Sequence, residues 1–279
     1  KFFISNDWPT ITGANLPSGG PAYPLSAPGL RLKVEPHRDV TLLAAIFDGD
    51  PGNQKDRNRD GLRFPLRDPA LLMAEAQLRT GEAAMPGAIR LGGWHHLGRF
   101  DHPRLGRDGR LLADPDGTGL ARRVRGSSGV YGVVDQQLFR PEGGGPKDGI
   151  SAYLRIGAST DPGSPIGIWA DGGIVVSGLV PGRPDDAFGA SFILARVGDA
   201  VRAADRDLAR FAGASDNLPV RSAEATLELS YQAQIVPGWI LQPDLQVVVR
   251  PGAGLVHPDR PDGRVRGGVV LGLRSTVVY

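Results

Sequence analysis

A strict alternation of polar and apolar residues runs through two neighbouring stretches of this chain and constrains the fold more than any other feature. Within residues 224–235 every second side chain is polar, and every side chain between them is apolar. After a turn at 237–238 the alternation resumes over residues 241–247. Successive side chains of a β-strand point to opposite faces of its sheet. Each stretch therefore predicts a strand with one polar and one apolar face.

Similar patterns, bounded by turn residues, predict about twelve strands along the chain. They cover residues 1–6, 29–36, 39–48, 70–80, 87–98, 128–140, 149–160, 166–179, 186–198, 221–236, 239–250 and 265–279. Most are about twice as long as the roughly 5–6 residues usual in soluble proteins. They are long enough for the roughly 9–11 residues that a membrane-spanning strand requires.

The connections between these predicted strands alternate between long and short. The long ones are 7–28, 49–69, 99–127, 199–220 and 251–264, and a short connection at 161–165 is the one exception to the alternation. Outer-membrane barrels have short periplasmic turns and long outer loops. We therefore predict an all-β fold, an antiparallel transmembrane β-barrel of the outer-membrane type. A soluble barrel or sandwich is the alternative.

Composition excludes several classes of protein. The chain has 279 residues, with 40 Gly, 24 Pro, no Cys and a formal net charge of +2. Gly and Pro at roughly twice their usual share indicate many turns. The lack of Cys excludes disulfides and Cys-ligated metals, and the balanced charge gives no reason to expect nucleic-acid binding. No apolar run approaches the roughly 18 residues of a transmembrane helix.

Several motifs are more specific than the strand pattern. They are LPSGGPAYPLSAPG (16–29), IFDGDPG (46–52), GGWHHLGRFD (92–101), LVPGRPDDAFG (179–189) and YQAQIVPGWILQPDLQVVVRPG (231–252). Together, and in this order, they resemble the OprB-type carbohydrate-selective porins. The resemblance covers essentially the whole chain. It implies an outer-membrane β-barrel for passive uptake of sugars such as glucose, with an arginine-bearing constriction in the pore.

The resemblance also implies a barrel of about 16 strands, within the range of such barrels. We therefore expect residues 1–279 to form a single β-barrel domain that lacks the N-terminal strands of the family. The opening residues KFFISNDWP do not form a signal peptide, and we expect the native polypeptide to begin earlier with one.

The polar faces of the predicted strands nominate residues that line the lumen. Sugar hydroxyls both donate and accept hydrogen bonds, so carboxylates, amides and guanidinium groups suit them. The substrate-path candidates are Glu75, Gln77, Arg79, Arg90, Trp94, His96, Asp135, Gln137, Tyr153, Arg155, Asp171, Glu224, Glu228, Gln232, Gln242, Asp244, Gln246, Arg266 and Arg274. For each of them, support of the barrel wall through cross-strand pairing is the competing role.

Tryptophan and histidine positions refine this hypothesis. Trp94 is the candidate for stacking against a sugar, with Arg90 and His96 as polar neighbours, although an interfacial aromatic girdle is the alternative. Trp239, beside the turn at 237–238, fits the girdle better. His95 and His96 are adjacent and point to opposite faces, so we predict no metal site there.

Two further motifs predict turns. The glycine-rich stretch 143–149 lacks the Gly-Lys-Ser/Thr ending of a phosphate-binding loop, so we interpret it as a turn. The sequence PGRPDD (181–186) predicts a turn with polar aspartates at its end. We find no Ser/His/acid spacing that indicates a hydrolase.

The sequence thus favours a porin for passive, carbohydrate-selective diffusion of small sugars, not an enzyme, and with no cofactor. The alternatives are a general diffusion porin with a weak sugar preference and a soluble sugar-binding β protein. The expected partners are small neutral sugars, outer-membrane lipid and lipopolysaccharide, without nucleic acid. The sequence leaves open whether the protein is a monomer or a homo-oligomer.

Overall fold

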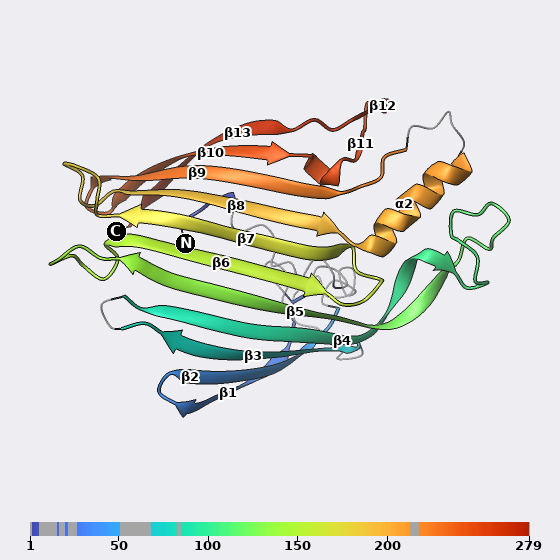
Figure 1. The fold of residues 1–279 in the computed structure, drawn as a ribbon, viewed down its shortest axis with the longest axis horizontal. Coiled ribbons are helices and arrows are strands. Elements are labelled where there is room, and N and C mark those ends of the chain that lie inside the picture. Colours follow the sequence, from blue (N-terminus) through green and yellow to red (C-terminus); the bar gives the residue numbers. More distant parts are fainter. Residues whose placement is uncertain are drawn as a thin grey trace.

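The computed structural model describes residues 2–5, 16, 20–21, 27–50, 68–82, 85–212 and 218–278. Its main feature is one 11-stranded antiparallel sheet in which each strand lies beside its sequence neighbour, up to the final step from β10 to β13 (Figure 1). The strands are β1 (Gly29–His37), β2 (Val40–Asp48), β3 (Ala70–Thr80), β4 (Gly87–Gly106), β5 (Ala121–Phe139), β6 (Gly149–Ser159), β7 (Ile166–Ser177), β8 (Ala187–Val197), β9 (Ala223–Val236), β10 (Trp239–Val249) and β13 (Gly268–Val277). This meander is the topology of an up-and-down barrel wall.

The short connections gather at one end of the sheet and the long ones at the other. The turns 38–39, 81–86, 140–148, 178–186 and 237–238 share the first end. The second end carries the connections 49–69, 107–120, 160–165, 198–222 and 250–267. Only 160–165 is short there, as the sequence indicated. Among the described strands, β1 and β13 are the edges of the sheet.

Two sequence predictions about strands were wrong. Residues 2–5 do not form a strand and instead contact one face of the sheet. β4 and β5 run beyond the predicted ends of 87–98 and 128–140, to Gly106 and back from Ala121. Register shifts within residues 96–106 interrupt the alternation there, so the two-residue period could not reveal this extension.

Three elements in the long connections were not predicted. These are the helix α2 (Asp199–Ala212), the 3-10 turn η3 (Pro251–Ala253), and the hairpin of β11 (Val256–His257) and β12 (Arg260–Arg264). α2 begins with acidic Asp199 and has basic Arg210 in its last turn, which complements the helix dipole. None of the helices among the described residues is long and apolar enough to cross a membrane.

The register gives the main sheet two different faces. The inner face carries buried side chains that include Leu71, Trp94 and Trp169. The outer face carries exposed apolar side chains, with Leu91 63%, Leu229 46% and Leu271 79% exposed. Many exposed apolar side chains on one face of a folded chain mark contact with a partner or a membrane.

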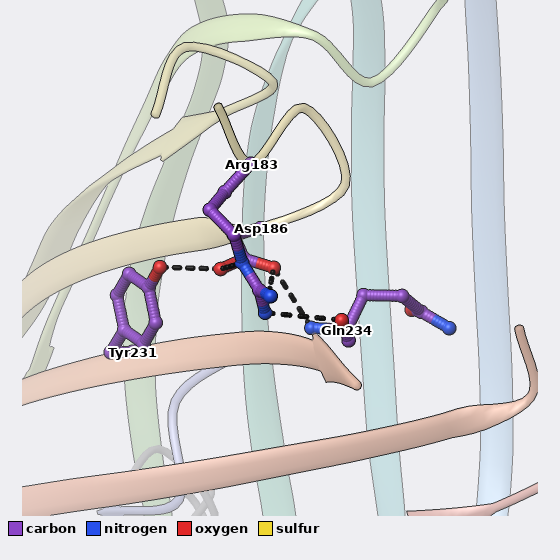
Figure 2. A network of polar contacts seen from close by, with 4 residues as sticks. All are labelled: Arg183, Asp186, Tyr231 and Gln234. Atoms are coloured by element: carbon purple, nitrogen blue, oxygen red, sulfur yellow. Dashed lines mark hydrogen bonds and ion pairs between the residues drawn. The ribbon is translucent and has the colours of Figure 1, made fainter. Parts of the chain in front are cut away.

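The turn between β7 and β8 is tied to β9 (Ala223–Val236) by one buried carboxylate. Asp186 accepts hydrogen bonds from Arg183 at 2.8 and 3.1 Å, from the Tyr231 hydroxyl, and from the Gln234 backbone N–H at 2.9 Å (Figure 2). The Arg183 guanidinium also donates to the Gln234 carbonyl at 3.1 Å. Hydrogen bonding to Arg183 is the main reason that the pKa of Asp186 is lowered to about 2. The predicted turn at 181–186 is therefore a closed polar network.

Candidate functional site

The inner face collects nearly all of the substrate-path candidates. The cross-strand register places Gln77 opposite Arg90, Arg155 opposite Asp171, and Gln242 opposite Arg274. Residues directly opposite in an antiparallel pair share a face. The same cross-strand pairing places the other candidates on strands β3–β10 on the inner face. Arg79 is exposed near the end of its strand. Arg266 is the exception, because it lies in the segment before β13 rather than in a strand.

The β3–β5 part of the inner face is a ladder of paired polar groups. The Tyr131 hydroxyl donates to Glu75 at 2.6 Å, and Gln77 donates to the same carboxylate at 2.5 Å. Arg90 forms an ion pair with Asp135. The Arg90 and Asp135 side chains remain 33% and 45% exposed, so a solute can reach both.

Trp94 is buried, contrary to the expectation of a stacking surface. Its side chain is 4% exposed and belongs to an apolar cluster with Leu16 and Leu71, which Phe47, Met73 and Tyr131 pack against. Gly129 lies directly opposite, and a Cβ there would be 1.9 Å from the indole. The indole face is thus covered in this structure, and the ring acts as packing for the wall.

His96 is also buried, and both of its ring nitrogens are hydrogen-bonded to the backbone. A ring nitrogen lies 2.9 Å from the Gly49 carbonyl, and the other accepts from the Gly98 N–H at 2.9 Å. Its side chain is 1% exposed. Among the described residues no group of three or more His, Cys, Asp or Glu side chains could hold a metal ion.

A second polar group lies on β6 and β7. The Arg155 guanidinium is 2.6 Å from Asp171 and lies 5.7 Å from the centre of the Tyr153 ring. Asp171 is only 4% exposed, whereas the Arg155 side chain is 33% exposed. Arg155 is therefore held in place from one side and accessible from the other.

The chain segment Phe2–Ser5 lies against the inner face at β7–β10. The carboxylate of Glu228 accepts from the Ile4 N–H at 2.9 Å and from the Ser5 N–H at 2.7 Å. Gln242 donates to the Phe2 carbonyl at 2.8 Å. Both side chains are 1% exposed. Two predicted lumen residues thus hold this segment rather than face open water.

Glycines make room for the segment. Phe3 is 2% exposed, and a Cβ on Gly173 or on Gly189 would lie 2.8 Å from its ring. The ring also packs against Tyr153, with centroids 6.3 Å apart. The sequence signal for this slot is the pair of glycines, which occupy inner-face positions on neighbouring strands.

The remaining candidates mostly support the wall. Gln232 donates to Gln242 at 3.0 Å, and Gln246 donates to Asp244 at 2.8 Å. Arg274 also donates to Gln242. Glu224 accepts from the backbone of the connection after β10, and Gln137 donates to the turn before β6 at 2.7 Å.

Comparison with known proteins identifies the family. The model of the OprB family of carbohydrate-selective porins matches residues 2–279. The chain belongs to this family. Porin B of Pseudomonas aeruginosa is 25% identical to this porin over 238 residues, which are 82% of this chain and 52% of that protein. The chain thus spans about half the length of this curated relative.

A solved structure shares the fold. The high-pH structure of Pseudomonas putida OprB matches this porin with a TM-score of 0.79 and 22% identity, over 91% of this chain and 59% of that one. The predicted fold class is thereby confirmed as the wall of an outer-membrane barrel. Family membership also confirms the predicted location in the bacterial outer membrane. Porins are channels, so the family is not one of enzymes.

Proposed function

We propose that this porin lets small neutral sugars diffuse passively across the outer membrane along its inner face. The observation that carries the proposal is the contrast between the two faces of one sheet. The outer face is apolar and exposed, as lipid contact requires. The inner face mixes carboxylates, amides and arginines, which is the chemistry that a hydroxyl-rich solute can use.

Two ion pairs bring opposite charges together on the inner face. Arg90 pairs with Asp135, and Arg155 pairs with Asp171. At these two positions the opposite charges offset each other, so neither pair attracts an ion of one sign strongly. They still offer donors and acceptors to a neutral sugar.

The accessible members of these pairs are the best candidates for sugar contact. Arg90, Asp135 and Arg155 are each at least 33% exposed, whereas Glu228, Asp171 and Trp94 are covered. A channel must release what it binds. We therefore expect millimolar affinity, which corresponds to about −4 kcal/mol.

Liposome swelling tests the proposal. Native porin in liposomes is given glucose, a disaccharide, or an amino acid similar in size to glucose, and we expect glucose to enter fastest. In Arg155→Gln we expect glucose flux to fall more than amino-acid flux. Leu154→Ala is the matched control, because Leu154 is the next residue and lies exposed on the outer face.

One outcome would contradict carbohydrate selectivity, and another would contradict the role of Arg155. If entry rates of unmodified porin follow solute size alone, the protein is a general diffusion porin. If Arg155→Gln lowers both fluxes equally, the Arg155–Asp171 pair shapes the wall without contacting sugar. Heat-modifiable mobility on gels would show that each variant has kept its folded barrel.

A further inference from the structure

β4 and β5 form a two-stranded ribbon that continues past the rest of the sheet. β3 pairs with β4 as far as His96, and β6 pairs with β5 from Gly129 onward. Among the described residues, no other strand pairs with the ribbon beyond these points, where Arg99 lies opposite Arg125 and Asp101 opposite Arg123. Figure 1 shows the ribbon at the end of the sheet where α2 lies.

The arginines of this ribbon lie on its outer side. The Phe100 ring packs 5.2 Å from the ring of His96, which is an inner-face residue, so Phe100 lies on the inner side. Arg99 is the next residue and therefore points outward. Arg125 shares its face because the two are directly opposite. Both side chains are exposed.

The charges on this side are not balanced within the described part of the chain. Arg123 is 3.2 Å from Asp101 and also donates to the Arg99 carbonyl at 2.7 Å. The side chains of Arg99 and Arg125 contact no described carboxylate. Like charges directly opposite each other destabilise a strand pair. An anion that contacts both guanidinium groups would remove this repulsion.

The arginine pair lies at the upper limit of the apolar surface. Ile89, Leu91 and Leu97 are exposed on the outer side of β4. Arg99 follows Ile89 by about ten residues, or about 33 Å along the strand. With a tilt of about 40° this is a height of about 25 Å, which is the height of the apolar band of such barrels. The ribbon lies at the end with the long connections, which in these barrels faces outward.

We propose that Arg99 and Arg125, with Arg123 beside them, bind the phosphate groups of lipopolysaccharide in the outer leaflet. The guanidinium group contacts phosphate oxygens with two parallel hydrogen bonds, and it keeps its charge at any relevant pH. Lipid chains would contact the apolar band below, while the phosphates neutralise the arginine pair. The site is separate from the inner face, so it does not depend on which solute the pore passes.

Lipid binding to the native porin purified in detergent tests the site. We compare bis-phosphorylated lipid A, fully dephosphorylated lipid A and inorganic phosphate by native mass spectrometry and by thermal shift. For Arg99→Gln/Arg125→Gln we expect at least tenfold weaker binding of phosphorylated lipid A. The control Arg206→Gln/Arg210→Gln removes the same charge from exposed positions of α2 at the same end and should change binding less than twofold.

Three results would overturn the proposal. They are unchanged lipid A binding by the Arg99/Arg125 variant, an equal loss in the α2 control, and equal affinity of the unmodified porin for dephosphorylated lipid A. Displacement of lipid A by millimolar inorganic phosphate would equally reject a lipid site in favour of a simple anion site. If the glutamine variant does not fold, Arg99→Lys/Arg125→Lys keeps both charges without the planar fork and should still weaken binding severalfold.

Discussion

At the scale of single residues, Val134 and Asp135 are neighbours in β5 that point to opposite faces. Both are well exposed, so water would reach either one in the absence of a membrane. Because the chain has no Cys, a cysteine at each position can be labelled alone. In outer membranes we expect a membrane-impermeant thiol reagent to modify position 135 and not position 134. Preferential labelling at 134 would show that the register is one residue out of phase.

Positions 134 and 135 suit this labelling test better than positions 227 and 228. Glu228 and Leu227 alternate just as clearly in the sequence, but Glu228 is 1% exposed beneath the segment Phe2–Ser5. A cysteine there would label poorly even if it faces the lumen.

Asp186 should make the stability of the porin depend on pH. Its pKa of about 2 is below the usual value, so the stability it contributes is complete above about pH 4 and is lost as the pH falls through 2. Asp186→Asn should lower the free energy of unfolding by about 2 kcal/mol near pH 6 and by much less at pH 2. Denaturant unfolding at several pH values measures this difference.

The neighbouring Asp185 provides the control. It is exposed, so Asp185→Asn should leave the unfolding free energy nearly unchanged at every pH. A loss of stability in Asp186→Asn that is the same at pH 6 and pH 2 would contradict a role for the charged carboxylate.

At the scale of elements, the segment Phe2–Ser5 occupies space on the inner face that would otherwise be open. Hydrogen bonds to a charged group contribute roughly 1.5–3 kcal/mol each, and Glu228 accepts two from the segment backbone. We expect Glu228→Ala to release the segment and raise single-channel conductance. Phe3→Ala, which empties the slot beside Gly173 and Gly189, should have the same effect.

Glu224 is the control for this prediction. It lies on the same strand and face, but its carboxylate accepts from Gly252 in the connection after β10. Glu224→Ala should therefore leave the conductance nearly unchanged. Unchanged conductance in both Glu228→Ala and Phe3→Ala would mean that the segment does not narrow the pore.

Sequence reasoning succeeded for elements whose pattern is periodic. β9 and β10 were predicted within one or two residues of their observed ends, because one face is apolar and the other polar throughout. It failed at residues 2–5, where a short apolar run fits a strand as well as a buried segment. The helix at 199–212 differs from the loop expected there, although this segment is rich in Ala, Arg and Asp and contains no Gly or Pro.

The same limit applies to the candidate site. Alternation assigns a side chain to a face, and every strand candidate does lie on the inner face. Alternation does not reveal what covers that face. Trp94 and Glu228 are buried by Leu16 and by residues 4–5, which are far away in the sequence. Such long-range contacts have no periodic signature.

At the scale of the whole molecule, the inner face has charges of both signs, and two arginines there are paired with aspartates. Arg90–Asp135 and Arg155–Asp171 are within ion-pair distance, so at these two positions of the described inner face both signs lie together. Strong ion selectivity arises from rings of like charge. We therefore expect the open porin, in a planar bilayer under a tenfold salt gradient, to show a reversal potential close to zero.

Asp135→Asn leaves Arg90 without its carboxylate and should shift the reversal potential toward anion preference, because the uncompensated arginine is partly exposed to the path. The Val134→Asn change on the outer face should cause no such shift. A large reversal potential in the unmodified porin, of either sign, would contradict a path suited to neutral solutes.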